Sequence, residues 1–344
     1  MQAVILAAGK STRTYPLTLT RPKPLLKAAN KAILERNLEA VKGLADEIIM
    51  VVGYGQEMIK KFILEKYPKL KIKYIEQKKQ LGTGHAVSVV KNHINGRFIL
   101  MMGDDIYQRQ DIKICIKSKY SILVTKVKNP GNFGVVQEKN GVLVNIIEKP
   151  EKFISNSIST ALYVLDGKIF KYVEKAGKGP RGEYEFPDAL VNFAKKQKIH
   201  CIKTTKYLPV AYPWDLLKAD KFFRKNKNSI GKNSKITGFV KNSSVGSDCI
   251  INGNIKNSII MDNAIIGKNS VVEDSIIGEN VSFDGKIISK NNTVSIVKNK
   301  RINAGRLGAI IGDNVTAKNV IINPGCKIWP NKIIENKTIR NDVL

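Results

Sequence analysis

The sequence has few histidines and cysteines for a chain of 344 residues, three and four respectively. Neither set has the paired spacing typical of zinc sites or disulfide frameworks, so structural histidines and buried, reduced thiols are expected. No apolar run approaches the length of a membrane span, and the short run at residues 3–8 has no basic region before it. The sequence therefore predicts a cytoplasmic protein with no membrane partner.

Acidic residues are also scarce, since 29 of them face 58 lysines and arginines, which gives a net charge of +29. Such a surface attracts anionic substrates. Nucleic acid is the alternative partner, but the lysines are spread along the whole chain without a compact basic block or a nucleic-acid-binding motif. Nucleic-acid binding is therefore not expected, and most of the excess charge is assigned to solvated surface.

Residues 1–212 alternate short apolar runs with amphipathic segments, which indicates an α/β fold with a mainly parallel sheet. A polar stretch at 225–229 separates this part from the rest of the chain. The predicted strands are 2–7, 47–52, 72–75, 97–102, 120–127, 134–137, 142–147, 158–165, 199–203 and 207–211, and the predicted helices are 32–43, 55–65, 82–94, 185–196 and one that ends near 224.

Beyond residue 230 the helical periodicity disappears, and aliphatic residues recur six positions apart. One example is the run Ile260, Ile266 and Val272. The same spacing occurs in two earlier pairs and one later run of three, which are Ile230 and Ile236, Val245 and Ile251, and Ile322, Ile328 and Ile334. A short fixed period predicts stacked, similar coils, with a sandwich of short strands as the alternative. The polar stretch at 284–309 interrupts the pattern.

The first strand leads directly into a loop of small and basic residues. It stops at Gly9 and is followed by Lys10, Ser11, Thr12 and Arg13. Such a loop leaves backbone N–H groups available to an anion, and arginine adds a planar fork of donors suited to phosphate. Lys23 lies between Pro22 and Pro24, which stiffen its backbone.

A second candidate site follows the predicted strand 97–102, which ends at Gly103, Asp104 and Asp105. Ligands of open α/β sheets bind beyond the carboxyl ends of the strands, so Asp104 and the first loop are expected at the same edge. A carboxylate is a hard oxygen ligand of the kind that Mg²⁺ prefers. The neighbouring Asp105 is interpreted as a turn carboxylate, because alternation along the chain points it elsewhere.

Taken together, G-K-S-T-R at 9–13, Pro16-Leu17-Thr18 and R-P-K-P-L-L at 21–26 resemble the signature of the sugar-1-phosphate nucleotidyltransferases. These enzymes join a nucleoside triphosphate to a sugar phosphate, with Mg²⁺ as cofactor, and release pyrophosphate. The resemblance implies a Rossmann-like catalytic domain at residues 1–226. The repeat at 230–344 resembles the hexapeptide repeat of a left-handed parallel β-helix, which would supply a homo-oligomer interface, by analogy a trimer. The family usually has glycine where this chain has Ser11.

The resemblance also implies roles for individual residues. Gln77 has an amide that complements the edge of uracil or thymine. Asp215 follows Trp214 in a segment that matches a metal-binding aspartate of the family. The implied catalytic residues are Arg13, Lys23, Asp104 and Asp215, with Asp104 and Asp215 holding the metal; the nucleotide contacts are Ala8, Gly9, Lys10, Ser11, Thr12, Arg13, Gln77, Gly82 and Thr83; and the sugar-phosphate contacts are Gly134, Glu148, Lys149 and Thr160.

The substrate stays open between two resemblances. The segment QLGTGHA at 80–86 resembles uridylyltransferases that act on N-acetylglucosamine 1-phosphate, whereas Trp214-Asp215 resembles thymidylyltransferases. UTP or dTTP, and glucose 1-phosphate or N-acetylglucosamine 1-phosphate, are therefore all retained. Two further alternatives are a bifunctional enzyme with an acetyltransferase in the β-helix and a non-catalytic regulatory subunit. All three histidines, His85, His93 and His200, precede the repeat, so no acetyl transfer is expected.

Overall fold

The computed structural model describes residues 1–179 and 182–344, which form two compact units. The first unit comprises Met1–Gly9 and Leu34–Pro209, and the second comprises Lys10–Ile33 and Val210–Leu344. The segment Lys10–Ile33 therefore belongs to the unit that contains the C-terminal third of the chain. Within the described residues, no helix is both long and apolar enough to cross a membrane.

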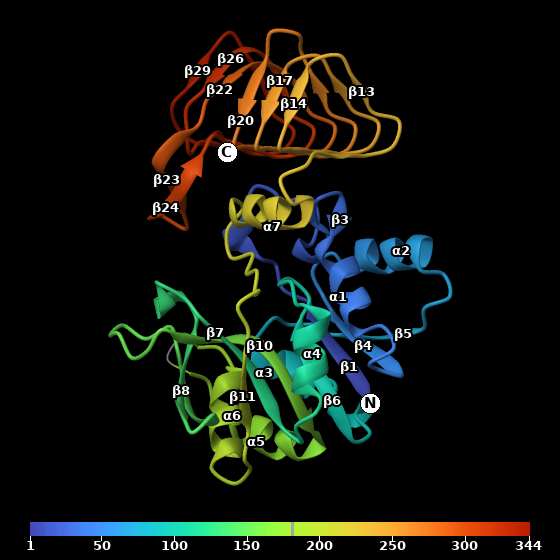
Figure 1. The fold of residues 1–344 in the computed structure, drawn as a ribbon, viewed down its shortest axis with the longest axis vertical. Helices are drawn as coiled ribbons and strands as arrows, with labels where there is room; N and C mark the ends of the chain where they lie inside the picture. Colours follow the sequence, from blue (N-terminus) through green and yellow to red (C-terminus); the bar gives the residue numbers. More distant parts are fainter. Residues whose placement is uncertain (180–181) are drawn as a thin grey trace. The chain divides into compact units, whose positions relative to one another are not determined.

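A nine-stranded mixed sheet forms the centre of the first unit, with the strand order β5-β4-β1-β6-β10-β7-β11-β9-β8 (Figure 1). Strand β1 (Gln2–Ala7) pairs in parallel with β4 (Glu47–Val52) and β6 (Arg97–Met102), and β10 (Ser157–Asp166) runs antiparallel to β6. This confirms the predicted α/β class. The other strands are β5 (Ile72–Glu76), β7 (Ser121–Lys126), β8 (Gly134–Lys139), β9 (Val142–Glu148) and β11 (His200–Lys203).

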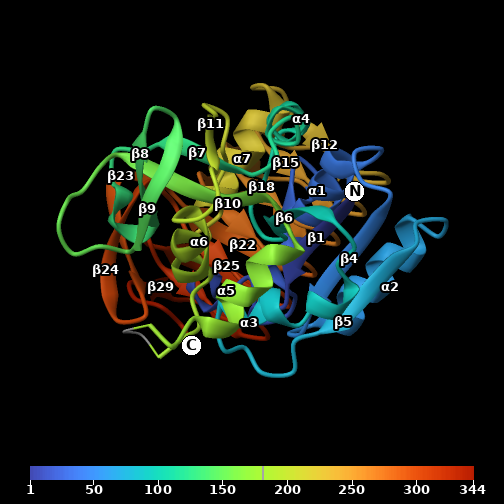
Figure 2. The same ribbon diagram turned by 90° about the horizontal axis from the view of Figure 1, so that it is seen from below.

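Helices α3 (Thr83–Ser88), α5 (Phe170–Lys175) and α6 (Phe186–Ala194) cover one face of this sheet (Figure 2). Their apolar side chains join alternate residues of the central strands, such as Val4 and Leu6, in one buried cluster. The residues that alternate with them, Ala3 and Ile5, are buried on the opposite face, as expected for a strand covered on both sides. The remaining helices are α1 (Ile33–Val41), α2 (Gln56–Lys66) and α4 (Arg109–Cys115) in the first part of the chain and α7 (Asp215–Arg224) in the second unit.

Two of the predicted elements are wrong in detail. Residues 207–211 form no strand beyond an isolated bridge between Leu208 and Ile106, because Pro209 lacks the N–H that a ladder needs. The helix predicted at 82–94 is divided into α3 and a short 3-10 turn at Lys91–His93. All four cysteines are free and buried, as predicted, and burial raises the pKa of Cys115 to about 12.

The second unit contains a parallel β-helix whose coils stack short strands in register (Figure 1). One face is a six-stranded sheet, and the other two faces are joined in a second sheet by β22 and β26. The first face contains β12 (Ser229–Ile230), β15 (Ser244–Val245), β18 (Ile259–Ile260), β21 (Ile276–Ile277), β25 (Ile310–Ile311) and β27 (Lys327–Ile328). The other faces contain β13 (Lys235–Ile236), β14 (Phe239–Lys241), β16 (Ile250–Ile251), β17 (Asn254–Lys256), β19 (Ile265–Ile266), β20 (Val271–Glu273), β22 (Ser282–Ile287), β26 (Thr316–Ile322), β28 (Ile333–Glu335) and β29 (Thr338–Ile339).

The aliphatic residues predicted six apart form the interior rows of these coils. Ile260, Ile266 and Val272 each lie on a different face and are fully buried. Ile230 and Ile236 are the exceptions, with exposed fractions of 45% and 36%, because their strands lie at the edge of the stack. The six-residue period therefore marks one face of the β-helix per repeat.

Asparagines at the turns between faces explain the composition of the repeat. Asn280, Asn314 and Asn331 have φ values of 55°, 58° and 63°, in the left-handed region that asparagine tolerates better than most residues. Their side chains form a ladder, because Asn280 donates to Asn314 and Asn314 donates to Asn331, both at 3.0 Å. The turns are thus held by hydrogen bonds between coils.

The interruption predicted at 284–309 is a β-hairpin inserted into the stack. Residues up to Ile287 still belong to β22, and β23 (Lys290–Val297) then pairs with β24 (Lys300–Leu307) in an antiparallel ribbon. The coil resumes at β25, whose Ile311 pairs with Ile277 of the coil before the insertion. The hairpin therefore leaves the interior rows continuous.

Replacing one interior isoleucine tests this arrangement. The side chain of Ile322 is buried, whereas the adjacent Ile321 is 52% exposed. We expect Ile322→Ala to lower the free energy of unfolding by about 2–5 kcal/mol, because it removes buried methyl groups and leaves a cavity. Ile321→Ala, the matched control, should cost less than about 1 kcal/mol. Denaturant unfolding measures both, and equal losses would contradict the assigned register.

Candidate functional site

The predicted anion-binding loop begins where β1 ends. Ala8 is buried, and its carbonyl accepts a hydrogen bond of 3.1 Å from the N–H of Tyr54. Gly9 and Lys10 are exposed, and Ser11 has φ 50° and ψ 47°. Serine therefore takes the left-handed conformation that glycine takes more easily. The loop keeps this backbone shape although it lacks the usual glycine.

Two threonines hold this conformation inside the second unit. The carbonyl of Ser11 accepts hydrogen bonds from the N–H of Thr14 at 3.0 Å, from its hydroxyl at 2.6 Å and from the hydroxyl of Thr18 at 2.9 Å. Thr18 belongs to the Pro-Leu-Thr motif, so this part of the signature fixes the turn. Thr12 follows Ser11 at the start of a short 3-10 helix and is half-buried.

Two aromatic residues support Arg13, namely Tyr212, which the sequence did not single out, and Trp214. Its guanidinium carbon lies 5.8 Å from the centre of the Tyr212 ring, and Tyr212 stacks on Trp214 with ring centres 5.0 Å apart. Such stacking orients a guanidinium without neutralising it. Lys23 opens the 3-10 helix Lys23–Leu25 and is 5% exposed. Both predicted phosphate ligands are therefore held in defined conformations.

Asp104 lies at the carboxyl end of β6, as predicted. The N–H of Gly103 donates to the carbonyl of Leu6 at 2.8 Å, and a Cβ on Gly103 would lie 3.0 Å from that oxygen. Glycine thus permits β6 to approach the end of β1, which places Asp104 at the same sheet edge as Ala8. Asp105 accepts a 2.6 Å hydrogen bond from Tyr207, which agrees with its assignment as a structural carboxylate. Burial and the charge of Asp105 raise the pKa of Tyr207 well above its usual range.

The second predicted metal ligand, Asp215, is the first residue of α7 and is 9% exposed. One carboxylate oxygen accepts from the N–H groups of Ala211 at 3.2 Å and Tyr212 at 2.9 Å. The other lies 2.9 Å from the ammonium of Lys218, whose side chain is 70% exposed. Only the oxygen on the Lys218 side could exchange its partner for another cation.

These carboxylates fit the Mg²⁺ that the family resemblance implies. Mg²⁺ usually binds to one or two carboxylates and completes its shell with water and substrate phosphates, so it does not need a large protein cage. The described residues contain no group of three or more His, Cys, Asp or Glu side chains arranged for a metal ion. Asp104 at a strand end and Asp215 at a helix start each offer one carboxylate, which is the type of ligand that such an open site uses.

Gln77 is buried, and its amide braces the loop that follows it. Its Nε2 lies 3.2 Å from the carbonyl of Gly82 and 3.1 Å from Nδ1 of His85. The sequence assigned both sides of this amide to a pyrimidine edge. In the structure the amide nitrogen of Gln77 is hydrogen-bonded within the protein. The side-chain carbonyl is therefore the group that could face a base.

Gly82, a predicted nucleotide contact, is required because another backbone segment lies close to it. Its φ is 113°, and a Cβ would lie 2.5 Å from the carbonyl oxygen of Tyr184. The close neighbour is therefore the 184 segment rather than a base. Gly84 also meets this segment, and its N–H donates to the Tyr184 carbonyl at 2.8 Å. The hydroxyl of Thr83 accepts from the N–H of Phe186 at 3.1 Å, so it serves the start of α6.

The predicted sugar-phosphate residues Gly134, Glu148 and Lys149 lie together. Gly134 of β8 is paired in register with Glu148 of β9, and a Cβ on Gly134 would lie 3.0 Å from the carboxylate of Glu148. The ammonium of Lys149 lies 3.3 Å from that carboxylate. Lys149 has φ 49°, and its N–H donates to the carbonyl of Phe133 at 2.9 Å. This places a half-exposed cation and an anion side by side.

Thr160 does not present its hydroxyl to this group. It is fully buried, and the hydroxyl donates to the carbonyl of Leu123 at 3.0 Å. The sequence missed Ser159 and Tyr163, whose hydroxyls lie 3.1 Å apart. Burial and the charge of Glu148 raise the pKa of Tyr163, so it remains a neutral donor. Ala161 has φ 57° at an irregularity in β10, a signal that is visible only in the backbone.

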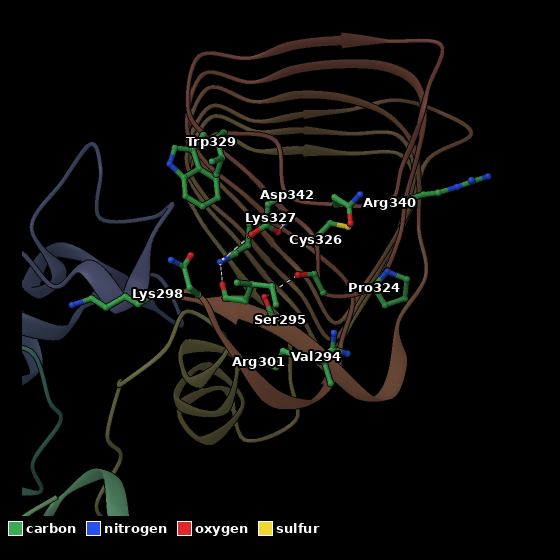
Figure 3. A pocket seen from close by; sticks show the side chains of 15 residues that line it. Val294, Ser295, Lys298, Arg301, Pro324, Cys326, Lys327, Trp329, Arg340 and Asp342 are labelled. Carbon is green, nitrogen blue, oxygen red and sulfur yellow. Dashed lines mark hydrogen bonds and ion pairs between the residues drawn. The ribbon is translucent and has the colours of Figure 1, made fainter.

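A separate hollow of about 590 Å³ lies in the β-helix, between the inserted hairpin and the last coils (Figure 3). Lys327 is 5% exposed there, forms an ion pair of 3.2 Å with Asp342 and lies 5.4 Å from the centre of the Trp329 ring. Lys298, Arg301 and Arg340 also line this hollow. Its cations could attract an anion, but it contains none of the predicted site residues.

The predicted site residues are thus divided between the two units. The second unit contributes Arg13, Lys23 and Asp215 with the loop residues Lys10, Ser11 and Thr12. The first unit contributes Ala8, Gly9, Gln77, Gly82, Thr83, Asp104, Gly134, Glu148, Lys149 and Thr160.

Comparisons with known proteins identify two consecutive regions of the chain. The Nucleotidyl transferase family model matches residues 2–224, and the GMPPB C-terminal domain model matches residues 219–344. The Bifunctional protein GlmU of Methanococcus vannielii is 35% identical, with 97% of this chain and 93% of the relative covered. A Bifunctional sugar-1-phosphate nucleotidylyltransferase/acetyltransferase of Sulfurisphaera tokodaii is 31% identical, with 95% and 94% covered.

A solved structure supports the fold of the N-terminal part. The crystal structure of a UDP-glucose pyrophosphorylase complexed with UDP-glucose superimposes with a TM-score of 0.57 at 23% identity, and covers 66% of this chain and 99% of its own. The family model covers more than half of the chain, and the relatives match it over nearly its full length. The chain therefore belongs to the nucleotidyl transferase family, with an appended parallel β-helix.

Proposed function

We propose that this protein transfers a nucleotidyl group from UTP or dTTP to glucose 1-phosphate or N-acetylglucosamine 1-phosphate and releases pyrophosphate. The observation that carries the proposal is the close approach of β6 to the end of β1 at Gly103, which places Asp104 at the edge where the phosphate loop starts. The reaction needs an acidic metal ligand beside a phosphate-binding loop. The sugar-1-phosphate nucleotidylyltransferase activity in the relative's name supports the same assignment.

The reaction requires the protein to stabilise the negative charge of the phosphate groups. An oxygen of the sugar phosphate attacks the α-phosphorus, the bond from that phosphorus to the bridging oxygen breaks, and pyrophosphate leaves with the electron pair. The backbone of residues 8–13, with the side chains of Arg13 and Lys23, would neutralise the triphosphate. Asp104 and Asp215 would hold Mg²⁺, which when bound supplies Lewis-acid stabilisation of the phosphoryl oxygens.

The remaining residues would recognise the base and the sugar phosphate. Gln77, through its side-chain carbonyl, and the backbone at Gly82 and Thr83 would face the pyrimidine. Lys149 would bind the attacking phosphate. Glu148 would accept hydrogen bonds from sugar hydroxyls beside Gly134, where the absence of a side chain leaves room. Thr160 would contact the sugar only through its backbone, because its hydroxyl is already bonded to Leu123.

We also propose the domain boundaries 1–226 for the catalytic domain and 230–344 for the left-handed β-helix domain, and a cytoplasmic homo-oligomer formed through the latter. Ile250 and Ile265 support the interface, because they are paired in register on neighbouring coils and are 40% and 44% exposed. Two adjacent apolar side chains favour contact with another subunit. Light scattering of an Ile250→Lys, Ile265→Lys protein would test this, and an unchanged subunit number would contradict it.

The reaction is tested by measuring pyrophosphate release with each of UTP, dTTP, ATP and GTP in combination with glucose 1-phosphate or N-acetylglucosamine 1-phosphate. We expect turnover with UTP or dTTP, with kcat/KM at least about tenfold above that for ATP or GTP, because a site built for a pyrimidine edge leaves polar groups unpaired with a purine. Comparable values for the purines would refute the base assignment. No release from any pair would favour the non-catalytic regulatory subunit.

Asp104→Asn tests the metal assignment. We expect a loss of turnover of at least about a hundredfold, since the amide keeps the shape of the side chain but removes the charge that attracts Mg²⁺. Asp105→Asn makes the same change one residue later, at a carboxylate bonded to Tyr207, and should stay within a few-fold of wild type. Rates over a Mg²⁺ titration and thermal unfolding of both variants give the comparison. A folded Asp104→Asn enzyme with a near-normal rate would disprove the assignment.

A second activity is not expected, although one relative has acetyltransferase in its name. Acetyl transfer to an amino sugar needs a base near neutral pH, usually histidine. All three histidines lie in the first unit, and none lies in the β-helix. We expect no release of free coenzyme A when acetyl-CoA is mixed with glucosamine 1-phosphate, as followed with a thiol reagent. Enzyme-dependent release above the rate with heat-inactivated protein would overturn this expectation.

A further inference from the structure

The R-P-K-P segment of the signature is bound to the coils of the β-helix within the second unit. The hydroxyl of Thr20 donates to the carboxylate of Asp313, and the guanidinium of Arg21 donates to Asp313 and Glu279. Four residues after Lys23, the ammonium of Lys27 pairs with Asp262. The segment that contains Lys23 is therefore held on both sides of this lysine.

The three acidic partners form one column, here called the acidic column, consisting of Asp262, Glu279 and Asp313. Each lies two residues after a strand position that pairs in register with the next coil: Ile260 with Ile277, and Ile277 with Ile311. Backbone hydrogen bonds continue this alignment, because Asn280 donates to the carbonyl of Asp262 and Asn314 to that of Glu279.

Two carboxylates of the acidic column are oriented by hydrogen bonds from the β-helix itself, in addition to their ion pairs with Arg21 and Lys27. One oxygen of Asp262 accepts from the N–H of Ser247 at 3.0 Å, and one oxygen of Asp313 accepts from the N–H of Glu279 at 2.8 Å. The second oxygen of each is the one that meets Lys27 or Arg21. Because the coils orient these groups, the acidic column forms a rigid template for the segment.

The ion pair between Arg21 and Asp313 is buried. Arg21 and Asp313 are 8% and 4% exposed. Burial alone would lower the pKa of Arg21, but its bonds to Glu279 and the charge of Asp313 raise it overall. A buried ion pair that loses one partner leaves an uncompensated charge, so the backbone on either side of Arg21 has little freedom to move.

A second anchor fixes the end of the same segment. The N–H of Ala29 donates to Asp220 at 2.8 Å, and the side-chain amide of Asn30 donates to the carbonyl of Val245 at 2.7 Å. Asp220 is 1% exposed and also accepts from the hydroxyl of Ser244. Residues 20–30 are thus attached to the β-helix side of the unit at several points.

We propose that Arg21 is a positioning residue, and that the acidic column acts through it to set the orientation of Lys23 for the nucleotide. Only Pro22, with φ fixed at −69°, separates Arg21 from Lys23, so a shift at Arg21 moves the lysine directly. This inference rests on the proposed function. It makes the β-helix a part of the nucleotidyl transfer machinery, although none of its coil residues need touch substrate.

The test uses conservative substitutions on the β-helix, far in sequence from any predicted substrate contact. Asp313→Asn and Glu279→Gln keep shape and remove charge. Glu335→Gln is the control, since its ion pair with Lys318 spans 3.7 Å on an exposed surface of the same β-helix. Should Asp313→Asn fail to fold, Asp262→Asn replaces it, because its pair with Lys27 is partly exposed.

The measurement compares how each substitution changes the kinetic constants for the nucleotide and for the sugar phosphate. In Asp313→Asn and Glu279→Gln we expect kcat/KM for the nucleotide to fall on the order of tenfold or more, as for other small displacements of a positioned group. The KM for the sugar phosphate should stay within about twofold, and Glu335→Gln should match wild type. In an Arg21→Gln background, Asp313→Asn should add little, because the residues act as a unit.

Three kinetic outcomes would overturn the proposal. Folded variants with normal nucleotide kinetics would show that the acidic column does not act on Lys23. An equal loss for both substrates, together with a lower unfolding temperature, would show a merely structural role. Independent effects of Arg21→Gln and Asp313→Asn would remove the route through Arg21. If the wild-type protein shows no turnover, the proposed function is wrong, and the inference is then tested by calorimetry of UTP binding to the wild type and the same variants. Variants that bind UTP as tightly as the wild type, or a wild type that does not bind UTP, would overturn the inference.

Discussion

Like charges stacked along the β-helix repel each other, and in this structure two cations of the segment Lys10–Ile33 neutralise them. Neighbouring coils of a parallel β-structure lie about 4.8 Å apart, and two unit charges at that separation repel by about 3 kcal/mol at an effective dielectric constant of 20. Asp262, Glu279 and Asp313 occupy successive coils. Without Arg21 and Lys27 the acidic column would oppose the stacking that its own coils require.

Arginine suits the buried part of this column better than lysine would. Its planar fork reaches Glu279 and Asp313 at once, on neighbouring coils, whereas a lysine is a single point charge. Lys27 is used where the pair is partly exposed and only one carboxylate must be met. These ion pairs join the segment Lys10–Ile33, which follows the first strand of the α/β sheet in sequence, to the β-helix within the second unit.

The sequence predicted those features that repeat locally. Alternating apolar runs gave the strands, the six-residue period gave the interior rows, and motif order gave the family. Contacts over long separations were not predictable in the same way. Arg21 and Asp313 are 292 residues apart, and an aspartate beside a β-helix turn looks in sequence like any solvated turn residue.

The candidate site shows the same limit at single residues. Gly82 was predicted as a nucleotide contact, but the group that approaches it closely is the backbone of Tyr184, which lies two residues before α6. The sequence offered Thr160 as a sugar contact, but the hydroxyl is used by Leu123 of the adjacent strand. The segment 207–211 looked apolar enough for a strand, although Pro209 removes a donor that the ladder needs.

Backbone strain is distributed differently in the two parts of the chain. In the β-helix, positive φ is taken mainly by asparagine, which forms ladders there and tolerates the conformation. Ser11, Lys149 and Ala161 also have positive φ, and they lack that compensation. Each costs on the order of 1–2 kcal/mol relative to an ordinary conformation. Ser11 and Lys149 belong to the phosphate loop and the sugar-phosphate group, and Ala161 follows Thr160, so part of the strain lies where the proposed substrates would need a fixed backbone. Ala29, Lys225 and Lys298 also have positive φ and lie outside the predicted site.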